Sequence, residues 1–188
     1  MPDPARKRNR RYHWKDVRAQ AFWKAVTLDR SNFLESLVAL LEERGVRYCV
    51  IGGQGVNAYV EPLVSLDLDL VIAVGQLPEV EALLRSRFVV EEFAHSLNIS
   101  ELGSDLRVQV QTDPRYFDFV DRATRREVLG VSLPVANLED ILQGKIWAAS
   151  DSARRTSKRR KDLLDIERIL ESYPGLRGGV PPEILGKL

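Results

Sequence analysis

Residues 51–53 read IGG and residues 65–72 read SLDLDLVI, with thirteen residues between Gly53 and Asp67. Successive side chains of a β-strand point to opposite faces, so Asp67 and Asp69 share one face at the start of an apolar strand. Two neighbouring carboxylates repel each other unless a positive charge lies between them. Mg²⁺ is the natural candidate, because it takes few carboxylates and completes its shell with water and phosphate oxygens.

The glycine pair lies where an apolar strand at 46–51 should end and a helix at 54–60 should begin. Such a helix start exposes unpaired N–H groups, which together with the helix dipole favour a bound anion. Glycine lets a ligand approach the backbone because no Cβ stands in the way. A plain strand-to-helix turn would give the same pattern, and an Asp-X-Asp pair alone is often a pair of solvated loop acids. Only the combination predicts a site for a metal and phosphate groups.

The composition is that of an ordinary globular chain. With 188 residues, 44% of them hydrophobic, it suits one domain with a small helical appendage. The net charge of +1 argues against attraction of nucleic acid over the whole surface, although basic residues cluster at 1–18 and 154–161. Cys49 is the only cysteine, which excludes an intrachain disulfide and a cysteine-based zinc site, and its apolar neighbours predict a buried thiol. No stretch approaches the roughly 20 apolar residues of a membrane span, and the basic N-terminus lacks the apolar stretch of a signal peptide, so a cytoplasmic protein is expected.

Hydrophobic periodicity and turn residues predict an α/β chain with a mixed sheet of about five strands. A helix capped by Ser31 should end near Gly45, and a helix over 138–149 should be capped by Asn137. Extended stretches are expected at 46–51, 68–74, 88–93, 96–100, 106–112 and 128–133. Further helices are expected around 14–26 and at 54–60, 79–86, 115–121 and 158–173, and the tail at 175–188 should be irregular.

Two sets of residues resemble a known superfamily. Gly52-Gly53, thirteen residues and Asp67-Leu68-Asp69 resemble the signature of the nucleotidyltransferases with a DNA polymerase β-like palm. Residues 135–145 (VANLEDILQGK) and 160–165 (RKDLLD) are similar to the AbiEii-type and related minimal nucleotidyltransferases of toxin–antitoxin systems. The resemblance covers roughly residues 46–172.

The resemblance implies Mg²⁺-dependent transfer of a nucleoside monophosphate from a nucleoside triphosphate such as ATP. Asp67 and Asp69 would hold the metal, and a lysine on the helix at 138–149, Lys145, would assist catalysis. The nucleotide would be bound by Gly52, Gly53, the amide of Gln54, Ser65, Lys161 and Asp162. For Ser65, the role of an ordinary turn serine explains the sequence equally well.

Spacing alone is less specific for the C-terminal residues. Lys145 is the only charge on an otherwise apolar helix face and should point toward the body of the protein, where we expect it to contact a phosphate or an acidic pair. The other reading is a lysine whose stem lies on apolar surface while its ammonium reaches water. Lys158 with Asp162, and Lys161 with Asp165, have the spacing of surface ion pairs on one helix face.

The sequence pattern indicates an organisation of the chain, and the resemblance implies a set of partners. A basic arm at 1–30 would precede the palm at 31–134, a helical section at 135–174 and the tail at 175–188. The partners would be a nucleoside triphosphate and either an RNA such as tRNA or a cognate toxin or antitoxin protein, with no membrane.

One departure from the family pattern opens an alternative. Active members usually carry a third carboxylate on a neighbouring strand, and the matching positions here are Gln109 and Gln111. An amide contributes no charge and is no general base near neutral pH. Asp113 could substitute only if the strand were displaced, and Asp113-Pro114 reads as a turn. The alternative is therefore a catalytically silent relative that binds nucleotide or a partner. A further alternative, based on the basic residues at 1–18, is an RNA-binding module that uses the basic arm.

Overall fold

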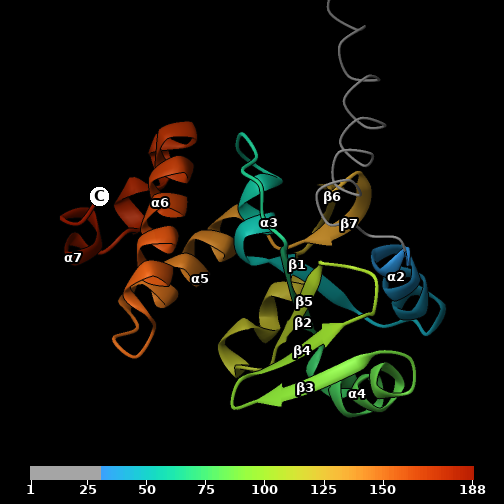
Figure 1. Cartoon of the computed structure of the whole chain (residues 1–188). Coiled ribbons are helices and arrows are strands. Elements are labelled where there is room, and N and C mark those ends of the chain that lie inside the picture. Colours follow the sequence, from blue (N-terminus) through green and yellow to red (C-terminus); the bar gives the residue numbers. More distant parts are fainter. Residues whose placement is uncertain (1–30) are drawn as a thin grey trace, which may run out of the picture.

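The computed structural model describes residues 31–188, and the expected arm at 1–30, with its helix around 14–26, lies outside the described residues (Figure 1). The strands are β1 (Tyr48–Ile51), β2 (Asp67–Ile72), β3 (Val89–Phe93), β4 (Ser96–Ser100), β5 (Arg107–Gln111), β6 (Thr124–Val128) and β7 (Val131–Val135). The helices are α2 (Phe33–Glu43), α3 (Gly52–Asn57), α4 (Leu77–Arg85), α5 (Leu138–Ser150), α6 (Thr156–Ser172) and α7 (Pro182–Leu185). Segments of 3₁₀ helix lie at Val74–Gln76, Pro114–Arg122 and Pro174–Gly179.

These strands form one mixed sheet in the order β3-β4-β5-β2-β1-β7-β6. β2 lies in the middle, antiparallel to β1 and parallel to β5, and its apolar residues are buried as the sequence predicts for a central strand. The α/β fold class is confirmed, but the prediction of about five strands is wrong, because the sheet has seven.

One additional strand comes from the hairpin of β6 and β7, where a single extended stretch at 128–133 was expected. The two strands pair through Val128 and Val131, and the turn between them uses Leu129 with φ 57° and Gly130 with φ 77°. Leucine rarely adopts the left-handed backbone, so nothing before Gly130 signals the turn.

The helices gather in two groups on opposite sides of the molecule: α5, α6 and α7 on one side, and α2 and α4 on the other (Figure 1). α2 buries Leu34, Leu37 and Leu41 as its periodicity predicts, but its N-cap position is Asn32 rather than Ser31. α5 begins at Leu138 after Asn137, whose side chain accepts a hydrogen bond from the Asp140 N–H as expected. α5 packs along α6 and brings that helix against the rest of the fold.

The tail at 175–188 was predicted to be irregular, and that prediction is wrong. It contains the end of a 3₁₀ segment and α7, and two of its apolar side chains, Val180 and Ile184, are buried. These side chains hold the tail against the core, while Pro174 and Pro182 each lie in the first turn of a short helical segment.

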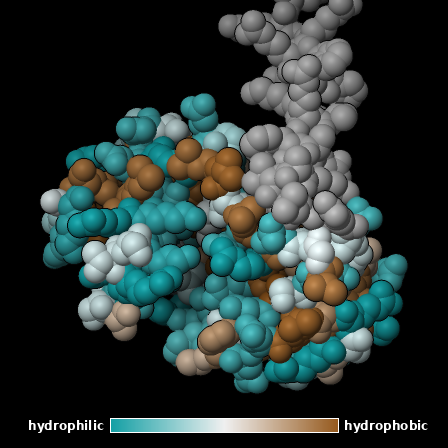
Figure 2. All heavy atoms as spheres, in the orientation of Figure 1, coloured by the Kyte–Doolittle hydropathy of each residue, from teal (hydrophilic) through white to brown (hydrophobic). Residues whose placement is uncertain are grey.

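The visible face in Figure 2 is mostly hydrophilic, with apolar atoms in separate groups. Exposed large apolar side chains such as Leu63, Val64 and Leu164 are normal on a folded domain. Among the helices of residues 31–188, none has the length and apolar character needed to cross a membrane.

Candidate functional site

The end of β1 meets the start of β2 beside the glycine pair. Ile51 pairs with Asp69 in the antiparallel register, so the chain leaves β1 at Gly52 next to that carboxylate. Gly52 has φ 64°, and a Cβ placed there would lie 2.7 Å from Asp69 Cγ and overlap the carboxylate. Glycine is required here both for the left-handed backbone and for the close approach. α3 therefore begins at Gly52 itself and ends at Asn57, earlier at both ends than the helix predicted over 54–60.

Asp69 lies at the centre of the site. Burial raises the pKa of its carboxyl above the usual range, Lys145 opposes this shift, and the neighbouring Asp67 adds to it. The carboxylate therefore lacks full compensation by the surrounding charges, and a cation bound beside it would favour its ionised form.

Asp67 lies nearer the surface and faces two basic side chains. Arg107, its partner in the register between β2 and β5, places Nη2 2.8 Å from Asp67 Oδ1. Lys158 places Nζ 3.8 Å from Asp67 Oδ2. Neither contact was predicted, because each joins segments that are far apart in the sequence.

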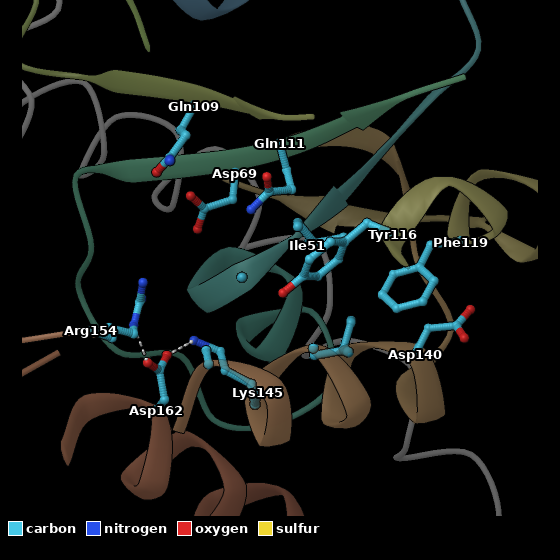
Figure 3. Close-up of a pocket in the computed structure, with 14 residues that line it drawn as sticks. Ile51, Asp69, Gln109, Gln111, Tyr116, Phe119, Asp140, Lys145, Arg154 and Asp162 are labelled. Atoms are coloured by element: carbon cyan, nitrogen blue, oxygen red, sulfur yellow. Dashed lines mark hydrogen bonds and ion pairs between the residues drawn. The ribbon is translucent and has the colours of Figure 1, made fainter. Parts of the chain in front are cut away.

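The position across from Asp69 on β5 is held by Gln109. Gln109 lies beside Asp69 in Figure 3, where a third carboxylate would be expected. Gln111 lies two residues further along and uses its Oε1 to accept the N–H groups of Thr112 and Asp113. Asp113 caps the following 3₁₀ segment and pairs with Arg115, so it does not replace the missing acid.

Lys145 is buried in a chain of charges between α5 and α6. Its Nζ lies 3.0 Å from Asp162 Oδ1 and 2.6 Å from Asp165 Oδ2. Arg154 extends the chain at 2.8 Å from Asp162, and Arg168 does so at 2.8 Å from Asp165. Burial alone would lower the pKa of Lys145, but the two aspartates outweigh it and the pKa is raised.

This network corrects the surface ion pairs expected on α6. Lys158 pairs with Asp67 rather than with Asp162, and Asp165 pairs with Lys145 and Arg168 rather than with Lys161. The spacing was compatible with surface pairing, but both aspartates lie on the buried face of the helix.

The loop before β2 is anchored by two of the predicted residues. Gln54 is buried, and its Nε2 donates to the carbonyl oxygen of Ser65 at 2.9 Å. The Ser65 hydroxyl in turn accepts the N–H of Asp67 at 3.3 Å. These bonds fix the approach of the chain to the two aspartates.

Two adjoining spaces meet at Asp69, and we call them the outer cleft and the inner cavity. The outer cleft, of about 150 Å³, is lined by Gly53, Ser65, Asp67, Asp69, Gln109, Lys145, Arg154, Lys158, Lys161 and Asp162. The inner cavity, of about 110 Å³, is lined by Ile51, Gly52, Asp69, Gln109, Gln111, Tyr116, Phe119, Asp140, Ile141, Gly144, Lys145, Ala148, Arg154 and Asp162. Figure 3 shows the inner cavity between β5 and α5. Eight of the nine predicted site residues line one space or both, and Gln54 lies behind them.

The family described as "Nucleotidyl transferase AbiEii toxin, Type IV TA system" matches residues 86–180. The chain belongs to the AbiEii nucleotidyltransferase family. The AbiEii match begins after β2, so it includes Lys145, Asp162 and Asp165 but not the glycine pair or the two aspartates of β2. No curated protein sequence matches the chain.

Solved structures extend the likeness beyond the AbiEii match. The antibiotic-resistance factor ANT(2'')-Ia is 15% identical with a TM-score of 0.51, over 78% of this chain and 90% of that one. The lincosamide antibiotic adenylyltransferase LnuA, in its lincomycin-bound form, is 14% identical with a TM-score of 0.51, over 74% of this chain and 97% of that one. These likenesses show a polymerase β-like nucleotidyltransferase fold, which the motif resemblance predicted.

Several residues of the site were missed from the sequence. Arg107, Arg154 and Lys158 reach the carboxylates, and Tyr116 reaches the inner cavity. The basic run at 154–161 was the available signal for Arg154 and Lys158, although it did not indicate which carboxylates they would reach. Nothing local distinguishes Arg107 or Tyr116, whose positions depend on strand pairing and on the 3₁₀ segment after β5.

Proposed function

We propose that the chain transfers a nucleoside monophosphate from a nucleoside triphosphate to a hydroxyl group of an RNA or a protein, with Mg²⁺ held by Asp67 and Asp69. The observation that carries the proposal is the outer cleft. There two carboxylates, a glycine-started helix and the side chains of Arg154, Lys158 and Lys161 converge on one space. Membership of a toxin–antitoxin family supports an acceptor in the RNA or the protein of the cell.

The residues present fit one divalent cation. A cation here would depend on two carboxylates and not on a larger cluster, since residues 31–188 contain no group of three or more His, Cys, Asp or Glu side chains that could hold a metal. Two carboxylates with the carbonyl oxygen of Gln109 are hard oxygen donors, and Mg²⁺ readily completes such a set with water and phosphate oxygens. The Asp69 carboxylate occupies the position that a Cβ of residue 52 would fill, so a glycine at 52 is what lets this ligand lie against the start of α3. When bound, the ion would neutralise phosphate oxygens and stabilise the charge of the departing pyrophosphate.

The basic residues of the cleft have separate roles in this proposal. Lys158 and Lys161 would bind the β- and γ-phosphates, together with the backbone of Gly53 and the hydroxyl of Ser65. Such transfer depends mainly on positioning and on charge stabilisation, so fixed cations beside the leaving group are what the reaction needs.

Lys145 and Asp162 would act through their neighbours. The Lys145 ammonium is buried and held by two aspartates, so it would position Asp162 and, through it, Arg154. Arg154 is partly exposed and lines both spaces, so it is the member of this chain of charges that can turn toward a phosphate.

The alternative of a catalytically silent nucleotide-binding relative is favoured by Gln109. An uncharged amide across from Asp69 leaves the site without a carboxylate to accept the proton of the attacking hydroxyl. The RNA-binding alternative depends on the arm at 1–30, outside the described residues.

The proposal is tested by incubating the protein with each of the four α-labelled nucleoside triphosphates, Mg²⁺, and cellular RNA or protein extract. We expect label to appear on one acceptor class with wild type and not with the double variant Asp67→Asn, Asp69→Asn. Unchanged thermal unfolding of the variant would show that the fold is intact. Transfer that persists in the double variant would exclude this site, and nucleotide binding without any transfer would support the silent relative.

A further inference from the structure

The inner cavity contains a polar group that no contact within the protein explains. Tyr116 is only 8% exposed, and Figure 3 shows its phenolic oxygen pointing into the cavity. Among residues 31–188 no hydrogen bond uses this hydroxyl, and its oxygen is not one of the sealed buried atoms, so it is reached from the cavity. A buried tyrosine usually directs its hydroxyl to a partner, so the group is available for a ligand.

The position of this hydroxyl is fixed by packing of the ring. The Tyr116 ring meets Phe119 edge-on at 5.3 Å and Trp147 edge-on at 5.3 Å. On its α5 side the ring lies so close to Gly144 that a Cβ there would be 3.1 Å from Tyr116 Cε1. The ring therefore has little freedom, and the hydroxyl is presented to the cavity without an ordering cost on binding.

The charges of the two spaces differ. Apart from Asp69, which both spaces share, the ionised side chains of the inner cavity are already paired. Lys145 and Arg154 hold Asp162, and Arg122 holds Asp140 through two bonds of 2.9 Å. In the outer cleft Lys161 is exposed and Lys158 has only the 3.8 Å contact with Asp67. A polyphosphate therefore belongs in the outer cleft, and an uncharged group belongs in the inner cavity.

We propose that the inner cavity binds the nucleoside half of the nucleotide, with the Tyr116 hydroxyl hydrogen-bonded to its sugar or base. This inference rests on the proposed function, because it places the polyphosphate over Asp67 and Asp69. The amide of Gln109 adds donors and acceptors beside the carboxylates, while Ile51, Phe119 and Ile141 supply the apolar walls that a sugar or base requires. Burial raises the pKa of Tyr116, against the opposing effect of Arg115, so the phenol stays protonated and neutral at physiological pH.

The test compares two ligands that share phosphates but differ in the nucleoside. Calorimetric binding of Mg²⁺ with inorganic tripolyphosphate reports on the outer cleft alone. Binding of Mg²⁺ with non-hydrolysable analogues of the four nucleoside triphosphates reports on both spaces. We expect Tyr116→Phe, which removes only the hydroxyl, to weaken analogue binding by roughly two- to tenfold, and to leave tripolyphosphate binding unchanged.

A second variant and a control guard against misfolding. Ala148→Leu adds volume from α5 into the cavity and should weaken analogue binding more than Tyr116→Phe, again without affecting tripolyphosphate. Tyr173→Phe is the matched control, because its hydroxyl bonds to the Tyr59 carbonyl at 3.1 Å and Tyr173 does not line the cavity.

The outcomes separate this inference from the function on which it rests. Tripolyphosphate binding with analogue affinities that neither variant changes would overturn the nucleoside assignment alone and point to the cavity as the place of the acceptor. Failure of both ligands to bind wild type would overturn the proposed function and this inference together.

Discussion

Gly52 and Asp69 occupy one small volume at the end of β1, and the geometry of the site depends on the side chain that residue 52 lacks. The backbone there is left-handed, and the Asp69 carboxylate fills the space where a Cβ would project. A substitution at Gly52 therefore has two separable effects, backbone strain and displacement of a metal ligand.

Gly45 allows these two effects to be distinguished. It has φ 62°, close to the 64° of Gly52, but no atom lies within 4 Å of its missing Cβ. Gly45→Ala and Gly52→Ala should each lower the free energy of unfolding by about 1–2 kcal/mol because of backbone strain. Only Gly52→Ala should also abolish Mg²⁺-dependent nucleotide binding, measured by calorimetry on the folded protein. Equal binding by both variants would contradict the role given to the close approach.

Gln109 is the residue at which this chain departs from the usual acid set. Gln109→Asp places a third carboxylate across from Asp69, and more ligand charge should tighten Mg²⁺ binding severalfold and raise the rate of any transfer. Gln111→Glu adds the same charge two positions further along β5 and should have a smaller effect. A Mg²⁺ titration of each variant checks this, and identical affinities for wild type and Gln109→Asp would show that position 109 does not face the metal.

At the scale of elements, the junction of α5 and α6 is held by buried charges. Lys145 pairs with both Asp162 and Asp165, whose side chains are each 3% exposed. Removing one partner of a buried pair leaves the other uncompensated, at a cost of about 3–5 kcal/mol. The junction should therefore be more sensitive to loss of the lysine than to loss of any surface cation nearby.

Lys145→Met tests this directly by chemical denaturation. We expect a loss of about 3–5 kcal/mol in the free energy of unfolding, partly restored when Asp165→Asn is added. Lys161→Met, on the exposed side of α6, should change stability by no more than about 0.5 kcal/mol. A Lys145→Met protein as stable as wild type would mean that the arginines alone neutralise the two aspartates.

Much of the element level could be predicted from the sequence, and the exceptions have physical causes. The apolar strands and the face of α5 with Lys145 follow from periodicity, and Gly52, Asp67 and Asp69 follow from a motif that is local in sequence. The hairpin at Leu129 was missed because a leucine holds the left-handed position. The charge network and the Tyr116 hydroxyl were missed because they depend on how α5, α6 and β5 meet, which local patterns do not encode.

At the scale of the whole molecule, Cys49 reports on global unfolding. Its side chain is fully buried in β1, and burial raises its pKa to about 12, with a smaller contribution from Asp140. The thiolate is the reactive form, and a raised pKa means that the thiol stays protonated well above pH 8. A thiol reagent at pH 8 should therefore label the native protein only as fast as the sheet opens, and at once in denaturant. Rapid labelling of native protein would contradict the burial of β1.

The two functional spaces also depend on the assembly of the whole chain. The outer cleft combines acids of β2 and α6 with bases of α5, the α5–α6 loop and α6. The inner cavity has walls from the sheet, the 3₁₀ segment after β5, and α5 with α6. Each space exists only when the helical section is packed against the sheet, so nucleotide binding should be lost together with that packing.

The most direct test of the account is calorimetric binding of ATP, GTP, CTP and UTP, with and without Mg²⁺, to wild type and to Asp67→Asn. We expect binding of at least one nucleotide that requires Mg²⁺ and is lost in the variant, while the variant unfolds at the same temperature as wild type. Absence of binding to all four nucleotides, or binding that survives both removal of Mg²⁺ and Asp67→Asn, would contradict it.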